Sequence, residues 1–320
     1  MTKSPDRKLR RNWKVWNLAY KYEDEWFLET ARRVVEEMPD PWPVQVMGRP
    51  PHPPKGLFLS CVYKVKKKIG YRGVESELEA NPGLVKKLCL LRPVGKSTLQ
   101  EAMDKIPEEY ADKFLRKLNE KFKENEKHLV TDGTGFGTNR YEKFMRKGEE
   151  EMRRKFQMYY FIGTHYWKLI LSQRVSRTLT GADSVMFREN LKDVSFGETI
   201  AGDKAYISKL NCELADQKGL KPYFAPKDNM SVKSEGPKPY ERMLQEYYGS
   251  REAWDPLYHT RSIAETLVGR LKQRTGKILS SISETIQKIE VKLKGIVNNL
   301  LVLNLVRASH LLGEPPLVPV

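Results

Sequence analysis

The order of strand-like and helix-like segments after residue 127 constrains the fold more than any other feature of this sequence. Short apolar segments bounded by glycine or aspartate alternate there with longer helical patterns. Three strands, then a helix, a strand, a helix, a strand and further helices predict an α/β fold, in which a mixed sheet is flanked by helices. We expect strands at 128–132, 159–164, 166–172, 198–202 and 221–225, and helices at 181–193, 206–218, 256–274 and 284–312.

The chain divides into four predicted parts. Residues 1–55 combine a basic start, a helix around 23–38 and a proline-rich run that predicts a stiff linker. Residues 56–122 show short helices with tight turns and basic flanks, a pattern typical of a helix-turn-helix-like DNA-binding region. An ordinary helical subdomain fits that pattern equally well. Residues 123–283 hold the sheet, with a polar insertion at about 226–255, and residues 284–320 form a C-terminal helix and tail.

The charge balance indicates a polyanionic partner. There are 57 Lys and Arg against 41 Asp and Glu, which gives a formal net charge of +16. Such an excess concentrates nucleic acid around a protein, although some basic proteins are merely soluble. The charge-rich stretch at 140–155 is expected to be a solvated helix or loop.

Cysteine usage and hydropathy exclude several classes of protein. The three cysteines are far apart and outside any CxxC arrangement, which argues against a zinc site or a disulfide framework. The N-terminus lacks the apolar core of a signal peptide. The most apolar stretch, 296–312, is interrupted by asparagine and arginine, so no membrane span or membrane partner is expected. We therefore expect a cytoplasmic, nucleoid-associated protein.

Two aspartates follow predicted strands, and these are the first candidates for chemistry. Asp132 ends Val-Thr-Asp-Gly-Thr-Gly, and Asp203 lies in Ala-Gly-Asp-Lys-Ala-Tyr. The carboxyl ends of strands are where α/β sheets present ligand-binding groups. Each aspartate taken alone also suits an ordinary turn.

A third candidate cluster lies on the predicted helix 256–274. Tyr258, Arg261, Glu265 and Lys272 fall within roughly 60° of one another around a helix axis, in a stripe about 21 Å long. Such a stripe presents a carboxylate between two cations, next to a phenol. An ordinary solvated i,i+4 ion pair between Arg261 and Glu265 would have the same spacing.

The three motifs together resemble the DDE-class insertion-sequence transposases whose final helix carries a Y-(2)-R-(3)-E-(6)-K signature. All four residue types and all three spacings match, and the two aspartate motifs occur in the family's order. The resemblance covers about 125 to 310. It implies a ribonuclease-H-like catalytic domain that performs metal-dependent cleavage and strand transfer of DNA at the terminal inverted repeats of a mobile element.

The resemblance also implies roles for individual residues. Asp132, Asp203 and Glu265 would be catalytic ligands of Mg²⁺, with Mn²⁺ as a substitute. Three close carboxylates repel one another unless cations lie between them, and two metal ions suit in-line phosphoryl transfer to water or a 3′-hydroxyl. Arg261 and Lys272 would bind DNA phosphates, and Tyr258 a phosphate or a displaced base.

The expected partner is double-stranded DNA, both the ends of the element and the target, bound by a homodimer. Two other functions share these features. One is a DNA-binding derivative of a transposase that has lost catalysis, which the intact carboxylates argue against. The other is a structure-directed nuclease on the same sheet, which the stripe on the last helix argues against.

Overall fold

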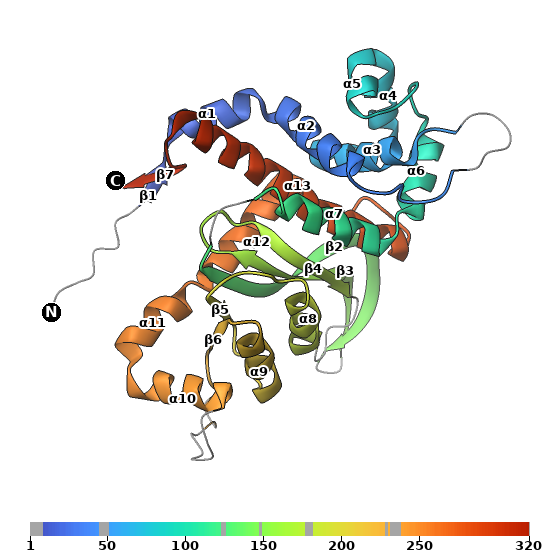
Figure 1. The fold of residues 1–320 in the computed structure, drawn as a ribbon. Helices are drawn as coiled ribbons and strands as arrows, with labels where there is room; N and C mark the ends of the chain where they lie inside the picture. The colour runs from blue at the N-terminus through green and yellow to red at the C-terminus, as the bar shows by residue number, and fades with distance from the viewer. Residues whose placement is uncertain are drawn as a thin grey trace.

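A five-stranded mixed sheet forms the centre of the molecule (Figure 1). The computed structural model describes residues 9–44, 51–122, 126–146, 149–176, 182–227, 230 and 238–319. The strand order is β4-β3-β2-β5-β6; the first three strands are antiparallel, and β5 and β6 run parallel to β2. This arrangement is ribonuclease-H-like and confirms the predicted fold class. The strands are β2 (His128–Arg146), β3 (Glu149–Thr164), β4 (Ile170–Ser176), β5 (Thr199–Gly202) and β6 (Lys221–Phe224).

Helices cover both faces of the sheet. On one face α7 and α13 pack against β4, while α8 packs against β3 and β4 from the other face (Figure 1). The part of the chain before β2 is mostly helical. The helices are α1 (Trp13–Lys21), α2 (Glu23–Glu36), α3 (Pro54–Lys67), α4 (Tyr71–Ala80), α5 (Pro82–Lys87), α6 (Lys96–Lys105), α7 (Glu108–Asn119), α8 (Ala182–Leu191), α9 (Lys209–Gln217), α10 (Pro239–Gly249), α11 (Arg251–His259), α12 (Ser262–Thr275) and α13 (Glu284–Leu312).

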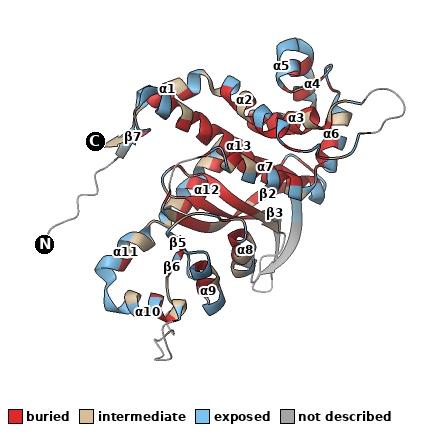
Figure 2. Cartoon of the chain, viewed as in Figure 1, coloured by how far each residue is buried: buried red, intermediate tan, exposed pale blue. Residues whose placement is uncertain are grey.

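Helix α13 joins the sheet to the N-terminal helices. It contacts α1, α2, α3 and α7 as well as β3 and β4, and Figure 2 shows it buried over most of its length. The asparagines that interrupt its apolar sequence have structural partners. Asn299 accepts a hydrogen bond from the backbone N–H of Ile170 at 2.9 Å and donates to its carbonyl at 2.7 Å. Within the described ranges, no helix is both long and apolar enough to cross a bilayer.

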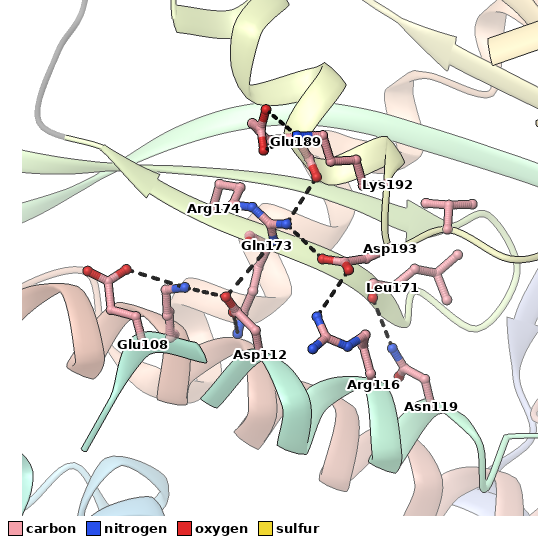
Figure 3. A network of polar contacts seen from close by, with 12 residues as sticks. Glu108, Asp112, Arg116, Asn119, Leu171, Gln173, Arg174, Glu189, Lys192 and Asp193 are labelled. Atoms are coloured by element: carbon pink, nitrogen blue, oxygen red, sulfur yellow. Dashed lines mark hydrogen bonds and ion pairs between the residues drawn. The ribbon is translucent and has the colours of Figure 1, made fainter. Parts of the chain in front are cut away.

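A polar network attaches α7 to the sheet (Figure 3). Asp193, which follows α8, accepts hydrogen bonds from Arg116 of α7 at 3.0 Å and from Arg174 of β4 at 2.8 Å. One turn earlier on α7, Asp112 accepts a hydrogen bond at 2.6 Å from Lys292, a buried residue of α13. The sheet, α8, α7 and α13 therefore form one connected body.

Some element predictions were wrong. The stretch at 140–155 contributes to β2 and β3, which form a long hairpin and not a solvated helix or loop. The strand predicted at 166–172 begins only at Ile170, because the chain turns back at Lys168 with a positive φ of 62°. A two-stranded sheet that was not predicted pairs β1 (Leu9–Arg11) with β7 (Leu317–Pro319).

Candidate active site

The sheet register brings Asp132 and Asp203 next to each other. Strands β2 and β5 are parallel neighbours, and their last registered pair is Val130 with Ala201. Asp132 and Asp203 each lie two residues further along. Because side chains repeat every two residues along a strand, both aspartates continue the face of that pair. Asp203 thus follows the carboxyl end of β5, whereas Asp132 lies inside β2, which continues to Arg146, so the prediction that a strand ends at Asp132 was wrong.

Glu265 lies close enough for its charge to act on Asp132. Burial raises the pKa of Asp132, and the negative charges of Asp203 and Glu265 raise it further. A hydrogen bond from the backbone N–H of Gly133 to Asp132 Oδ1, at 2.8 Å, opposes this rise without cancelling it. Asp132 is half-buried, whereas Asp203 and Glu265 are exposed. The result is an acidic edge that is open to solvent on one side.

Helix α12 carries Glu265 and is seated on the sheet by an apolar stripe. Ala264, Leu267 and Leu271 are buried at the i, i+3, i+7 spacing of one helix face. The close approach of α12 to the sheet depends on Gly163 in β3, where an added Cβ would lie 2.7 Å from Leu267 Cδ1. Glu265 lies in the first turn of α12, beside this anchored face.

The stripe of four residues does not lie on one continuous helix, so that prediction was wrong. Helix α11 ends at His259 and α12 begins at Ser262. Between them the backbone makes i→i+3 hydrogen bonds, such as Arg261 N–H to the Tyr258 carbonyl at 3.0 Å, in place of the i→i+4 bonds of an α-helix. The tighter turn changes the angular spacing on which a single-helix stripe depends.

Tyr258 and Arg261 form a stack beside the acidic edge. The ring of Tyr258 lies parallel to Trp254 at 4.7 Å, and the Arg261 guanidinium lies 5.3 Å from the centre of the same ring. Burial raises the pKa of Tyr258; the charge of Arg261 opposes this rise, and that of Asp203 adds to it. Tyr258 and Arg261 are therefore neighbours of the Asp203 side of the site.

Lys272 lies on the Asp132 side. Its ammonium group is 5.5 Å from the centre of the Phe136 ring, on β2 beyond Asp132. Burial lowers the pKa of Lys272 and Lys277 lowers it further, while the charge of Asp132 raises it. Charge interactions thus connect Asp132 with Asp203, Glu265 and Lys272, and Asp203 with Tyr258, on which Arg261 stacks.

Comparison with known families decides what this neighbourhood belongs to. The family model described as Transposase DDE domain matches residues 123–305, more than half of the chain. The chain belongs to this family. The DDE domain contains β2, β5 and α12, and with them all three carboxylates. It also contains α13 up to Leu305, so the family match extends beyond the boundary predicted at 283.

Two solved structures are similar to this chain. One is a piggyBac transposase synaptic complex with hairpin DNA, with 12% identity, a TM-score of 0.44, and coverage of 96% of this chain and 78% of the other. The second is a Mos1 transposase paired-end complex with the left transposon end, with 8% identity, a TM-score of 0.19, and coverage of 77% and 96%. Comparison with curated proteins gives no match.

One acidic residue of the DDE domain site was missed. Asp183, in the first turn of α8, raises the pKa of Asp132, and the charge of Asp203 adds to the effect of burial in raising the pKa of Asp183 itself. A Cβ added to Gly133 would meet Asp183 Oδ1 at 3.4 Å, which places this carboxylate against the strand that carries Asp132. Aspartate is common in the first turn of a helix, so nothing in the sequence distinguished it.

The donor set of the DDE domain suits a hard divalent cation. It consists of carboxylate oxygens; the charges of Asp203 and Glu265 raise the pKa of Asp132, and a cation would relieve this repulsion. In the described part of the chain, no three His, Cys, Asp or Glu side chains lie close enough together to enclose a metal ion. Mg²⁺ retains several waters and needs only one or two protein carboxylates, so an open arrangement is compatible with it.

Proposed function

We propose that this protein is a DNA transposase of the insertion-sequence group with the Y-R-E-K signature. It would cleave a mobile element at its terminal inverted repeats and join the ends to target DNA. The observation that supports the proposal is that the charges of Asp203 and Glu265 both act on Asp132, within a region that matches the DDE domain family and in which β2 and β5 pair in parallel.

Asp132, Asp203 and Glu265 are the residues that would hold Mg²⁺, or Mn²⁺ in its place. Bound there, the divalent ions supply the positive charge that activates a water or a 3′-hydroxyl and stabilises the leaving oxygen. The half-buried Asp132 is fixed by β2 and by its hydrogen bond from Gly133. Glu265 is fixed by the packing of α12. Both carboxylates are thus positioned before any ligand arrives.

The cations beside the carboxylates would bind the DNA backbone. Arg261 can contact a phosphate through two parallel N–H donors, and Lys272 acts as a compact positive charge. Arg261 is already stacked on Tyr258, which limits its orientations. The stack of Trp254, Tyr258 and Arg261 would hold a phosphate, or an unpaired base, on the Asp203 side of the edge.

The remaining parts of the chain would bind and pair the DNA ends. We propose that residues 56–122 contact double-stranded DNA and that two copies of the chain act together on paired ends. Helix α3 is buried, whereas α4 and α5 have exposed faces that carry Arg72, Lys86 and Lys87 and would be available to DNA.

The test is cleavage and strand transfer by purified protein, with Mg²⁺ and duplexes that carry the element's ends. Asp132→Asn, Asp203→Asn and Glu265→Gln should each reduce cleavage by about 10³-fold or more while DNA binding persists. The matched control is Asp216→Asn, which removes an exposed carboxylate paired with Arg242 and should leave cleavage unchanged.

Three results would contradict the proposal. Undiminished cleavage by any of the three variants would show that the substituted residue is not part of the site. Binding by the unaltered protein without cleavage would indicate an inactive derivative. Cleavage of branched DNA regardless of its end sequence would indicate a nuclease.

A further inference from the structure

The second face of α12 carries two arginines that the acidic edge does not use. Arg270 and Arg274 lie one turn apart, roughly 140° and 180° around the helix axis from Glu265. They face α1, α13 and the β1–β7 pair, where they line a pocket of about 760 Å³. The same helix therefore presents Glu265 and Lys272 on one side and this pocket on another.

The pocket is strongly cationic. Six of its lining side chains are positively charged and one is a carboxylate, Glu23. Glu23 lies 3.3 Å from the ammonium group of Lys66, which also pairs with Asp24, so the cationic excess comes from the other five positive side chains. The positive side chains are Arg11, Lys66, Lys68, Lys168, Arg270 and Arg274.

The two arginines are half-buried, and three of their donor atoms are buried without partners. Arg270 Nε and Nη2 and Arg274 Nη1 are inaccessible to water and have no hydrogen-bond acceptor among the described residues. The polar contact of Arg270 is a long one, 3.5 Å from Nη1 to the Trp167 carbonyl. A buried guanidinium with unsatisfied donors is strongly unfavourable unless something else supplies acceptors.

Neighbouring positive charges make the position of the two arginines still less favourable. Burial lowers the pKa of Arg270 far below its ordinary range, and the charges of Arg274 and Arg11 lower it further. Burial lowers the pKa of Lys168, and the charge of Arg270 adds to that effect. Like charges are thus held together in a space large enough for a ligand, and an anion would reverse the sign of each of these interactions.

We propose that this pocket binds a phosphate group. A phosphate offers several strong acceptor oxygens, and guanidinium groups can bind it through paired donors. Thr266 and Gln273, on the same side of α12, supply neutral polar groups to the pocket lining. The source is a DNA backbone phosphate or a free phosphate compound. With DNA as the source the inference rests on the proposed function and adds a second contact, behind the catalytic edge.

The experiment compares the full-length protein with the variant that carries Arg270→Gln and Arg274→Gln. The first arm measures binding of a duplex by fluorescence anisotropy over a range of salt concentrations. Loss of two phosphate contacts should reduce the slope of log K against log salt by about 1.8 and weaken binding at least about tenfold at physiological salt. The second arm measures binding of inorganic tripolyphosphate through the fluorescence of Trp16 and Trp167, which line the pocket.

Two variants serve as controls. Arg32→Gln removes an exposed arginine that is paired with Glu36 and does not line the pocket, and it should behave like the unaltered protein. Lys68→Asn replaces an exposed pocket residue whose φ of 57° asparagine tolerates, so it tests the site even where the double variant fails to fold. It should reduce the salt slope by about 1.

A loss in both arms, or in the DNA arm alone, supports a DNA phosphate, and a loss in the tripolyphosphate arm alone supports a free phosphate compound. Unchanged binding in both arms, for Lys68→Asn as well as for a folded double variant, would overturn the inference. None of these readouts requires cleavage. Failure of the pocket is therefore distinguishable from failure of the proposed function, which would show as absent cleavage with pocket binding intact.

Discussion

Helix α12 separates two regions of opposite charge, and the difference between them is instructive. On one side Asp132, Asp203 and Glu265 form an acidic edge that is partly open to water. On the other, Arg270 and Arg274 lie in a cationic pocket, with donors that neither water nor the described residues satisfy. Each region gathers like charges that the described part of the chain leaves uncompensated. We infer that both are maintained for ligands of opposite sign and that each lowers the stability of the free protein.

The first prediction concerns a substitution that should disrupt both regions at once, because it moves α12, the helix that they share. In Gly163→Ala the new Cβ would lie 2.7 Å from Leu267 Cδ1 and 3.0 Å from the Leu169 carbonyl oxygen. Relief of this overlap should shift α12, cost about 1–3 kcal/mol of unfolding free energy, and reduce cleavage by about 10²-fold. Chemical denaturation and the cleavage assay measure the two effects.

The control for this prediction lies on α12 itself. A Cβ added to Gly269 has no atom within 4 Å, so Gly269→Ala should raise stability by about 0.5–1 kcal/mol and leave cleavage unchanged. Equal effects of the two substitutions would show that the position of α12 on the sheet does not matter.

The second prediction separates the two regions by their ligands. Mg²⁺ at tenfold its dissociation constant should stabilise the unaltered protein by about 1.4 kcal/mol, and tripolyphosphate, added without Mg²⁺, by a similar amount. Asp132→Asn should lose the response to Mg²⁺ alone, and Arg270→Met the response to tripolyphosphate alone. Thermal unfolding measures both, and each variant is the control for the other. Loss of both responses in either variant would contradict two independent sites.

The directions of the pKa shifts also predict that each region destabilises the protein when its ligand is absent. The raised pKa of Asp132 means that the folded protein binds this proton more tightly than the unfolded chain, so stability falls as the pH rises through that pKa. Asp132→Asn should therefore raise the melting temperature of the metal-free protein at neutral pH. Arg270→Met should raise the melting temperature in phosphate-free buffer, because it removes an unpaired buried charge.

The third and smallest prediction concerns acidification. Burial, together with the charges of Lys168 and His128, lowers the pKa of His165 from 6.5 to about 4. The unfolded chain then binds this proton more tightly between these values, so stability should fall as the pH falls from 6.5 to about 4. The effect should stay below about 1 kcal/mol, because His165 is only half-buried. His165→Asn should flatten this part of the pH profile; an unchanged profile would exclude His165 as its source.

The sequence predicted the sheet where local pattern and partner strands agree. The apolar segments of β2, β5 and β6 have the expected strand character, although β2 continues through Asp132 and Gly133, where a turn was expected. By contrast, the charged stretch at 140–155 has no apolar face, and its strand character comes from pairing within the hairpin, which a local pattern does not reveal.

The candidate site also combines features that the local sequence predicts with features that it does not predict. Asp132, Asp203 and Glu265 could be chosen from their motifs because strand ends and spacing are local properties. The break between α11 and α12 could not, because helical periodicity continues through Thr260 and Arg261 while the backbone tightens there. Asp183 and Arg270 were missed for a related reason. Their importance comes from what packs around them and not from their neighbours in sequence.

Binding of Mn²⁺ to the protein–DNA complex, followed by electron paramagnetic resonance, tests the central claim most directly. If Asp132, Asp203 and Glu265 hold the same divalent ions, then Asp132→Asn, Asp203→Asn and Glu265→Gln should each weaken Mn²⁺ binding at least about tenfold, the loss expected when a ligand carboxylate is neutralised. Asp216→Asn should bind Mn²⁺ like the unaltered protein. Retention of full affinity by any one of the three site variants would contradict a shared metal site.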